Sequence, residues 1–232
     1  MRLLNAHRPR ATWDALASAE TELYVGDPSR AREELESLFA RLGADPRGGM
    51  CVEVGCGPGR MTAALAERFE RVLAVDVSPA MVARARAAVP EGNVSFRVVS
   101  GDRLDGVDGG LADVLVCYLV LQHLPSRTAV AGYLREFARV LRPRGQAFVQ
   151  VPVLEAGLRP RLWRMLRSVA VPMLARLSSD PARAPSFRGF RLTGAELVGA
   201  LAAAGLRVSA RDEGPDAPYR HSRDVFLRLE AG

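Results

Sequence analysis

The stretch from Cys51 to Thr62 reads CVEVGCGPGRMT, and it decides the fold expected for this chain. An apolar run that contains one acid, Glu53, leads into glycines at positions 55, 57 and 59. Glycine tolerates positive φ and lets another group lie against the main chain. The stretch therefore predicts a strand that ends in a tight turn, with a ligand held over the turn.

Apolar, strand-like runs alternate with helix-length segments through most of the chain. The expected strands are 52–55, 71–76, 94–99, 112–118, 145–151, 207–211 and 225–230. The expected helices are 12–17, 29–42, 60–69, 79–89, 127–141 and 193–204. Strands that are apolar throughout and separated by helices indicate a parallel sheet covered on both faces. We predict a Rossmann-like, doubly wound α/β fold with seven strands, mostly parallel, whose last strand returns antiparallel after the loop at 213–219.

A single domain over residues 1–232 accounts for the length of the chain. The expected parts are an N-terminal helical cap (1–49), a cofactor-binding core (50–151), a lid insertion (152–192) and a closing helix with two strands (193–232).

The insertion has its own helical pattern, and Pro172 should bend or divide the helix. Its apolar residues recur every three or four positions at Leu158, Leu162, Leu166, Val169, Met173 and Leu177. The arginines between them are Arg159, Arg161, Arg164, Arg167 and Arg176. The favoured interpretation is a lid whose apolar side covers the pocket and whose arginines are solvated. The alternative is that 158–177 contacts a membrane surface, an acyl carrier protein or an anionic substrate.

Composition narrows the class of protein. Apolar residues make up 48% and charged residues 25%, as in folded globular proteins. The net charge is +6 and the pI about 10.0, but all 32 basic residues are arginines spread along the chain. This indicates a generally basic surface, and nucleic acid is an unlikely partner.

The cysteines and the N-terminus bear on the compartment. Three cysteines without a CxxC pair argue against a metal site or a disulfide framework and favour a reducing compartment. No apolar run is long enough to span a bilayer and no signal peptide is recognisable, so a cytoplasmic protein is expected. Nothing in the sequence sets the oligomeric state.

Five short motifs carry a resemblance to a known family. They are Val52-Glu-Val-Gly-Cys-Gly-Pro-Gly59, Val75-Asp-Val-Ser-Pro-Ala-Met81, Gly101-Asp102, Asp113-Val-Leu-Val-Cys117 followed by Leu121-Gln-His-Leu-Pro125, and Leu141-Arg-Pro-Arg-Gly145. In this order and spacing the chain resembles class I S-adenosylmethionine-dependent methyltransferases. Its Pro143-Arg144-Gly145 departs from the Pro-Gly-Gly that is common in the family. The resemblance implies S-adenosylmethionine as cofactor and methyl transfer to a small molecule.

By this resemblance, Glu53 lies near the amino group of the cofactor, Asp76 accepts from both ribose hydroxyls, and Asp102 accepts from the adenine amine. A helix-capping role would suit Ser78 better than Asp76. Met81 either flanks the adenine or belongs to the core. The full predicted set for the cofactor is Glu53, Gly55, Cys56, Gly57, Gly59, Asp76, Val77, Met81, Asp102 and Arg103.

His123 is the candidate base for a hydroxyl acceptor, and Tyr118 is expected to line the methyl channel. The alternative for His123 is packing at the 121–125 turn. Trp13 and Tyr24 are candidates to close over the ligand, although packing suits Trp13 somewhat better.

Motifs that are missing favour a small-molecule acceptor over a nucleobase. The sequence has no Asn or Asp before Pro-Pro-Tyr or Pro-Pro-Phe, and no cysteine follows a proline. The competing hypotheses are a nicotinamide-dependent oxidoreductase, which needs a glycine where Arg60 stands, and a non-catalytic cofactor-binding relative that serves regulation or scaffolding.

Overall fold

The protein is built on one sheet, seen in a computed structural model that describes residues 3–17, 27–175, 189–216 and 221–232. Along the sheet the strands follow the order β3 (Val94–Val98), β2 (Arg71–Asp76), β1 (Met50–Val54), β4 (Ala112–Cys117), β5 (Leu141–Leu154), β8 (Ser222–Ala231) and β7 (Leu206–Asp216). The first five are parallel, β8 runs antiparallel to β5 and to β7, and a short β6 (Leu192–Thr193) adds to β5. The predicted fold class is confirmed, with β6 as an eighth strand.

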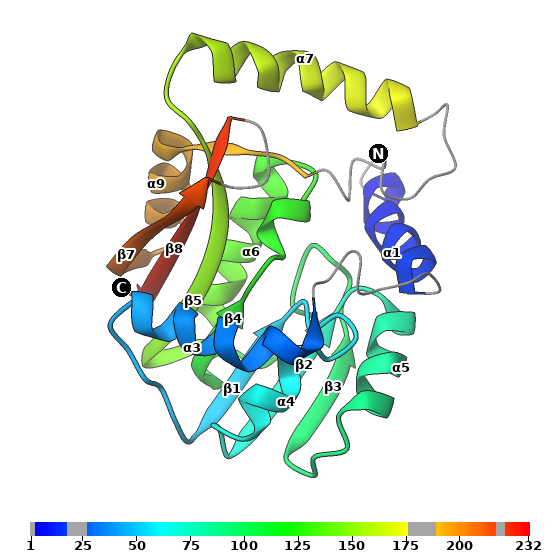
Figure 1. The fold of residues 1–232 in the computed structure, drawn as a ribbon, viewed down its shortest axis with the longest axis vertical. Coiled ribbons are helices and arrows are strands. Elements are labelled where there is room, and N and C mark those ends of the chain that lie inside the picture. Colours follow the sequence, from blue (N-terminus) through cyan, green and yellow to red (C-terminus); the bar gives the residue numbers. More distant parts are fainter. Residues whose placement is uncertain (1–2, 18–26, 176–188, 217–220) are drawn as a thin grey trace.

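Helices cover both faces of the sheet (Figure 1). On one face lie α3 (Ala31–Arg41), α4 (Thr62–Ala66) and α5 (Pro79–Ala88), and on the other lie α6 (Arg127–Val140) and α9 (Gly194–Ala203). Successive strand residues point to opposite faces. Val72 therefore packs with the α3 and α4 cluster while Leu73 packs with the α6 cluster. This double burial is why the central strands are apolar throughout.

Local signals place several ends of elements where the sequence predicts them. Ser78 accepts a hydrogen bond from the Met81 amide and Pro79 follows it at the start of α5. Thr193 and Glu196 form a reciprocal capping box at the start of α9. The predicted helix at 60–69 is shorter, because only Thr62–Ala66 is α-helical. β5, β7 and β8 are longer than predicted, because β8 pairs with β5 and with β7 over most of its length.

The N-terminal helix α1 (Leu3–Ala17) packs against α5 beside the carboxyl ends of β2 and β3 (Figure 1). Arg10 Nε donates to the Val77 carbonyl at 3.1 Å, and Asp14 accepts from the Ala80 amide and from the Ser78 hydroxyl. A short 3-10 turn, η1 (Pro28–Arg30), leads into α3. Tyr24 lies outside the described residues.

Helix α7 (Leu158–Ala175), in the segment predicted to be a lid, crosses one end of the molecule (Figure 1). It continues past position 172, so the predicted division there does not occur. Its orientation corrects the sequence prediction: the apolar stripe faces outward, while Arg164 and Arg167 face the protein. Leu177 and Arg176 lie outside the described residues.

Acceptors on the protein side explain this orientation. Arg164 bonds Glu196 at 2.6 Å and the Arg191 carbonyl at 3.1 Å, and Arg167 donates to the Gly189 carbonyl at 2.7 Å. The periodicity of a helix reveals its two faces but does not show which one meets the protein. The surface beneath α7 offers oxygen acceptors to guanidinium groups, so the arginine side docks.

Candidate functional site

A pocket opens at the carboxyl ends of β1, β2 and β4, with about 1100 Å³ of space when its open mouth is included. This is the edge where ligands bind in open α/β sheets. The predicted residues that line it are Glu53, Gly55, Cys56, Gly57, Asp76, Val77, Met81, Tyr118 and His123. Trp13 of α1 also lines it, which places the N-terminal helix over the pocket.

The glycine turn brings bare main chain to the pocket. Gly55 has a φ of 76° and Gly57 a φ of 54°, in the left-handed region that favours glycine. A Cβ on Gly55 would lie 2.3 Å from Cγ2 of Val120. The Gly55 and Cys56 amides both donate to the Val75 carbonyl, which ties the turn to the end of β2.

Gly59 has a different task from the other two glycines. Its φ is 90°, and a Cβ there would lie 2.9 Å from Val89 Cγ2 and 3.2 Å from Ala85 Cα. It does not line the pocket. Gly59 thus allows α5 to pack closely against the turn, and its predicted contact with a cofactor remains a prediction.

Asp76 is held in place by the main chain at the end of β2. Its two carboxylate oxygens accept from the Gly57 and Ser78 amides, each at 2.9 Å. The side chain is buried, and this burial raises its pKa. Each carboxylate oxygen can accept a second hydrogen bond, so Asp76 joins the glycine turn to the pocket and keeps acceptor capacity for a ligand.

Glu53, near the end of β1, is the second buried acid of the pocket. Its Oε2 accepts from the Thr62 hydroxyl at 2.6 Å, and burial raises its pKa to about 7. Arg60 also lines the pocket, but it forms an ion pair with Glu34 at 2.8 Å. Two buried carboxyl groups beside an arginine that is already paired with Glu34 give a site suited to a cationic ligand.

Residues of η2 (Leu121–His123) and the end of β4 form another wall of the pocket. The His123 ring packs edge-on against the Trp13 ring, with 4.8 Å between the ring centres. Its Nε2 lies 3.1 Å from Gln122 Nε2. The Arg60 guanidinium lies over the Tyr118 ring, 6.0 Å from its centre. Burial raises the pKa of Tyr118, so its hydroxyl stays protonated near neutral pH.

Residues 189–191 support η2, and the sequence analysis did not predict this support. Buried Arg191 donates to the Gln122 carbonyl at 2.7 Å, and the Phe190 amide donates to the Leu124 carbonyl at 2.7 Å. A Cβ on Gly189 would lie 1.7 Å from the Gln122 carbonyl oxygen. These contacts join residues far apart in the chain, so no local sequence pattern predicts them.

The buried side chain of Gln150 holds the residues that follow β4, and the sequence analysis did not predict this role either. Gln150 accepts from the Leu119 amide at 3.2 Å and donates to Asp224. Leu119 has a φ of 59°, unusual for a residue with a side chain, and it lines the pocket. The position of Gln150 in an apolar strand was the available signal, since buried amides need partners.

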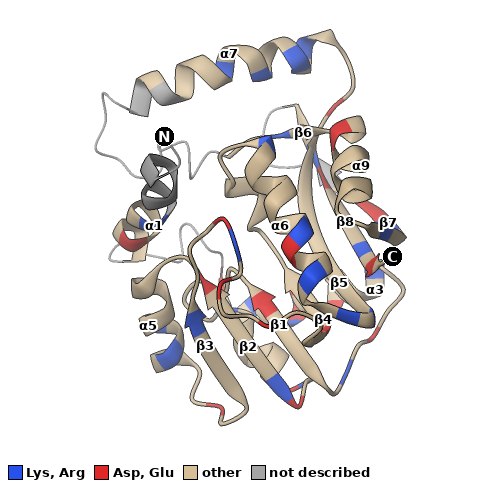
Figure 2. Cartoon of the chain, turned by 180° about the vertical axis from the view of Figure 1, so that it is seen from behind, with Lys and Arg blue, Asp and Glu red and all other residues tan. Residues whose placement is uncertain are grey.

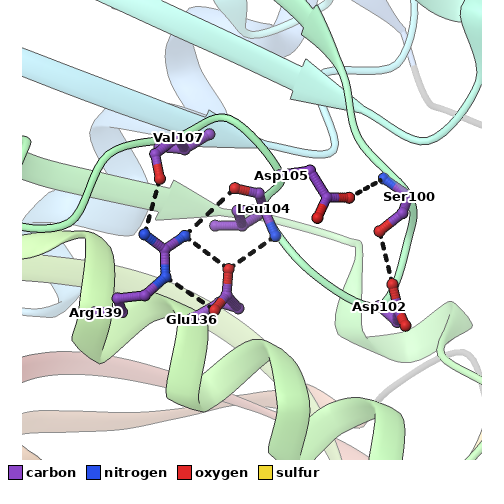
Figure 3. A network of polar contacts seen from close by, with 7 residues as sticks. All are labelled: Ser100, Asp102, Leu104, Asp105, Val107, Glu136 and Arg139. Atoms are coloured by element: carbon purple, nitrogen blue, oxygen red, sulfur yellow. Dashed lines mark hydrogen bonds and ion pairs between the residues drawn. The ribbon is translucent and has the colours of Figure 1, made fainter.

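The loop after β3 carries the predicted adenine contacts and is anchored to α6 (Figure 3). Arg139 donates to the Val107 carbonyl at 2.8 Å, and the Leu104 amide donates to Glu136 at 2.9 Å. Hydrogen bonds from Arg139 lower the pKa of Glu136. Asp102 is exposed and accepts from the Ser100 hydroxyl at 2.6 Å.

Two of the predicted adenine contacts thus lie outside the pocket lining. Asp102 and Arg103 are exposed and follow Gly101, which does line the pocket. Their contacts with adenine remain predictions.

The thiols offer no nucleophile, because Cys51, Cys56 and Cys117 are buried and burial raises the pKa of each. Within the described ranges, no group of three His, Cys, Asp or Glu side chains is arranged to hold a metal ion.

A family model described as "Methyltransferase domain" matches residues 52–149. The chain is 33% identical over 139 residues to a ubiquinone biosynthesis O-methyltransferase of Xanthomonas axonopodis pv. citri, covering 59% of this chain and 54% of that protein. It is 31% identical over 176 residues to a trans-aconitate 2-methyltransferase of Azoarcus sp., covering 75% of this chain and 63% of that protein. The chain thus spans a little over half the length of the curated relatives it matches.

The fold is similar to that of the N-methyltransferase NodS from Bradyrhizobium japonicum, solved in complex with S-adenosyl-L-homocysteine. The TM-score is 0.64 at 16% identity, and the match covers 97% of this chain and 98% of that one. At this identity the likeness concerns the fold.

Proposed function

Since the chain belongs to the class I S-adenosylmethionine-dependent methyltransferases, we propose that it transfers a methyl group from S-adenosylmethionine to a small molecule. The observation that carries the proposal is the joint placement of Glu53, Asp76 and the Gly55–Gly57 main chain around one pocket. The relatives named as acting on ubiquinone precursors and trans-aconitate support a small acceptor. A cytoplasmic location is part of the same proposal.

The pocket fits the cofactor on physical grounds. S-adenosylmethionine carries an ammonium and a sulfonium, and the pocket holds two buried carboxyl groups, of which Glu53 has a pKa raised to about 7. A cation beside Glu53 favours its ionised form. Asp76 keeps an accepting position on each oxygen for two ribose hydroxyls, and Val77, Met81 and Val99 supply apolar walls for an adenine.

When bound, the cofactor supplies a methyl that is already electrophilic. The residues of this chain hold the acceptor in line with it and exclude water, which is the main requirement of such a displacement. Trp13 and Leu119 line the pocket, and Tyr118, with its raised pKa, donates a hydrogen bond to an acceptor oxygen.

His123 is proposed to take the proton from a hydroxyl acceptor, because it lines the pocket and its ring packs edge-on against Trp13. Extracts incubated with the enzyme and isotopically labelled S-adenosylmethionine should yield a methylated product by mass spectrometry. Calorimetry with S-adenosyl-L-homocysteine tests the binding step. No binding at several hundred micromolar would contradict the proposal, and full binding without any methylated product would favour the non-catalytic alternative.

The variant His123→Gln separates two roles. A large fall in kcat with unchanged affinity for S-adenosyl-L-homocysteine supports a base. Normal turnover would remove His123 from catalysis and leave it the packing role beside Trp13.

A further inference from the structure

The described helices include none that is both long and apolar enough to cross a membrane. Helix α7 nevertheless exposes six large apolar side chains, which is unusual for a surface helix of a globular protein. Their exposed fractions are 84% for Leu158, 53% for Leu162, 60% for Met165, 60% for Leu166, 66% for Val169 and 61% for Met173.

These six side chains form one continuous stripe. At about 100° per residue they fall within an arc of about 100°, and from Leu158 to Met173 the stripe extends about 22 Å along the helix. Arg159 and Arg161, both exposed, stand on its two borders. The opposite side of the helix carries Trp163, Arg164 and Arg167, each half-buried.

Contacts on the inner side prevent the stripe from turning inward. Arg164 and Arg167 are bonded to Glu196 and to the main chain of residues 189–191, and the Trp163 ring meets His221 at 5.9 Å. A rotation that buried the leucines would break these bonds and expose buried partners. The outward direction is therefore a stable feature of the described structure.

Charge indicates what the stripe meets. The segment LRPRLWRMLRSVAVPMLA contains four arginines and no acid, and Figure 2 shows blue segments and no red one along the described part of α7. We propose that α7 lies in the surface of an anionic lipid bilayer, with its leucines among the acyl chains and Arg159 and Arg161 at the headgroups. A helix with an apolar stripe, basic borders and no acid has the composition of an interfacial helix.

The shape of the helix favours a bilayer over a protein partner. The stripe stands on a convex helix rather than in a groove, so a flat, deformable surface can contact all six side chains at once. α7 also follows β5 at the sheet edge where the pocket opens. Docking by α7 therefore turns the pocket-bearing edge of the sheet toward the bilayer.

Flotation with lipid vesicles tests the proposal without any methyl transfer. Vesicles of equal parts phosphatidylglycerol and phosphatidylcholine should bind the protein at least about tenfold more tightly than pure phosphatidylcholine, and salt at about 0.5 M should reduce this preference. The variant Leu162→Gln/Leu166→Gln/Val169→Gln should lose binding by at least about 30-fold. Arg159→Gln/Arg161→Gln should lose about tenfold on anionic vesicles alone.

Matched controls come from elsewhere on the surface. Val198→Gln changes a side chain that is 62% exposed on α9, and Arg135→Gln changes an exposed arginine on α6; both should float like the wild type. Circular dichroism and affinity for S-adenosyl-L-homocysteine verify the fold of every variant.

Equal binding to both vesicle types, or a triple variant that floats like the wild type, would overturn the proposal. The proposal would also be overturned if the wild type sedimented as a dimer and did not bind vesicles, while the triple variant sedimented as a monomer. The stripe would then be the contact surface for a second copy of the chain.

Discussion

The pocket and helix α7 both place side chains where they are not usually found. The pocket buries acidic groups, whereas α7 exposes apolar ones. In the pocket, Glu53 and Asp76 are carboxyl groups only 5% and 8% exposed. On α7, leucines are exposed while Arg164 and Arg167 face the protein. Buried acids and exposed apolar stripes both carry a free-energy cost that a ligand or partner can relieve. The pocket suits a small cation and α7 suits an apolar surface, so the two regions serve different kinds of binding.

Removing the carboxylate of Asp76 should have the largest effect on ligand binding in the pocket. Asp76→Ala deletes two hydrogen bonds from the Gly57 and Ser78 amides and the two remaining acceptor positions. Hydrogen bonds to a charged group contribute about 1.5–3 kcal/mol each, so affinity for S-adenosyl-L-homocysteine should fall about 100-fold. Calorimetry measures the loss. Asp108→Asn, at an exposed loop acid outside the pocket lining, is the control and should bind normally. Unchanged affinity in Asp76→Ala would exclude the ribose role.

Glu53→Gln should stabilise the ligand-free protein while weakening cofactor binding. Glu53 has a pKa of about 7 in the folded state against its ordinary value of 4.5, so the folded state holds more protons than the unfolded state between these values. The contribution of Glu53 to the free energy of unfolding therefore falls as pH rises from 4.5 through 7. The variant lacks this loss and should be more stable than the wild type at pH 8 by on the order of 2 kcal/mol, and by much less at pH 5.

Urea unfolding at the two pH values measures that difference, and calorimetry adds a second readout. Wild-type affinity for S-adenosyl-L-homocysteine should rise between pH 6 and pH 8 as Glu53 ionises beside the ligand ammonium. Glu53→Gln should flatten this rise. A stability difference that is the same at both pH values would mean that Glu53 is ionised throughout.

The sequence predicted the pocket well because its parts are local. Glycines with positive φ, an acid at a strand end and a Ser-Pro helix start each act within a few residues, so short patterns encode them. The parallel arrangement of the central strands follows from the alternation of apolar runs and helices. Gly59 shows the limit even here, since its packing against Ala85 and Val89 of the α5 region depends on a distant part of the chain.

The parts that the sequence did not predict depend on long-range contacts. Arg191 supports η2 from 69 positions away, and Gln150 reaches Asp224 across 74. The apolar spacing of α7 predicted a helix correctly but gave the wrong buried side. Helical periodicity is the same whether the leucines or the arginines meet the protein, and only the acceptors at Glu196 and at residues 189–191 decide between them.

Arg164→Gln tests whether those acceptors hold α7 in place. The ion pair with Glu196 is partly shielded from water, with side chains 24% and 20% exposed, so its loss should cost about 1 kcal/mol. Local opening should increase more visibly than global unfolding, with amide hydrogen exchange in 158–175 about tenfold faster. Arg159→Gln, on the exposed border, should change neither quantity. Unaltered exchange in Arg164→Gln would show that other contacts fix the helix.

The smallest effect is expected for a substitution in the exposed stripe of α7, and it tests whether the stripe is exposed in solution. Leu166→Ala should change the free energy of unfolding by less than about 0.5 kcal/mol, because its side chain is 60% exposed and leaves no cavity. The same substitution at Leu134 of α6, which is 1% exposed, should cost about 2–5 kcal/mol. Denaturant unfolding of the pair, without lipid, measures both. A cost at Leu166 approaching that at Leu134 would mean that the stripe is buried in solution. The contrast between buried acids in the pocket and an exposed apolar stripe on α7 would then fail, and the membrane proposal with it.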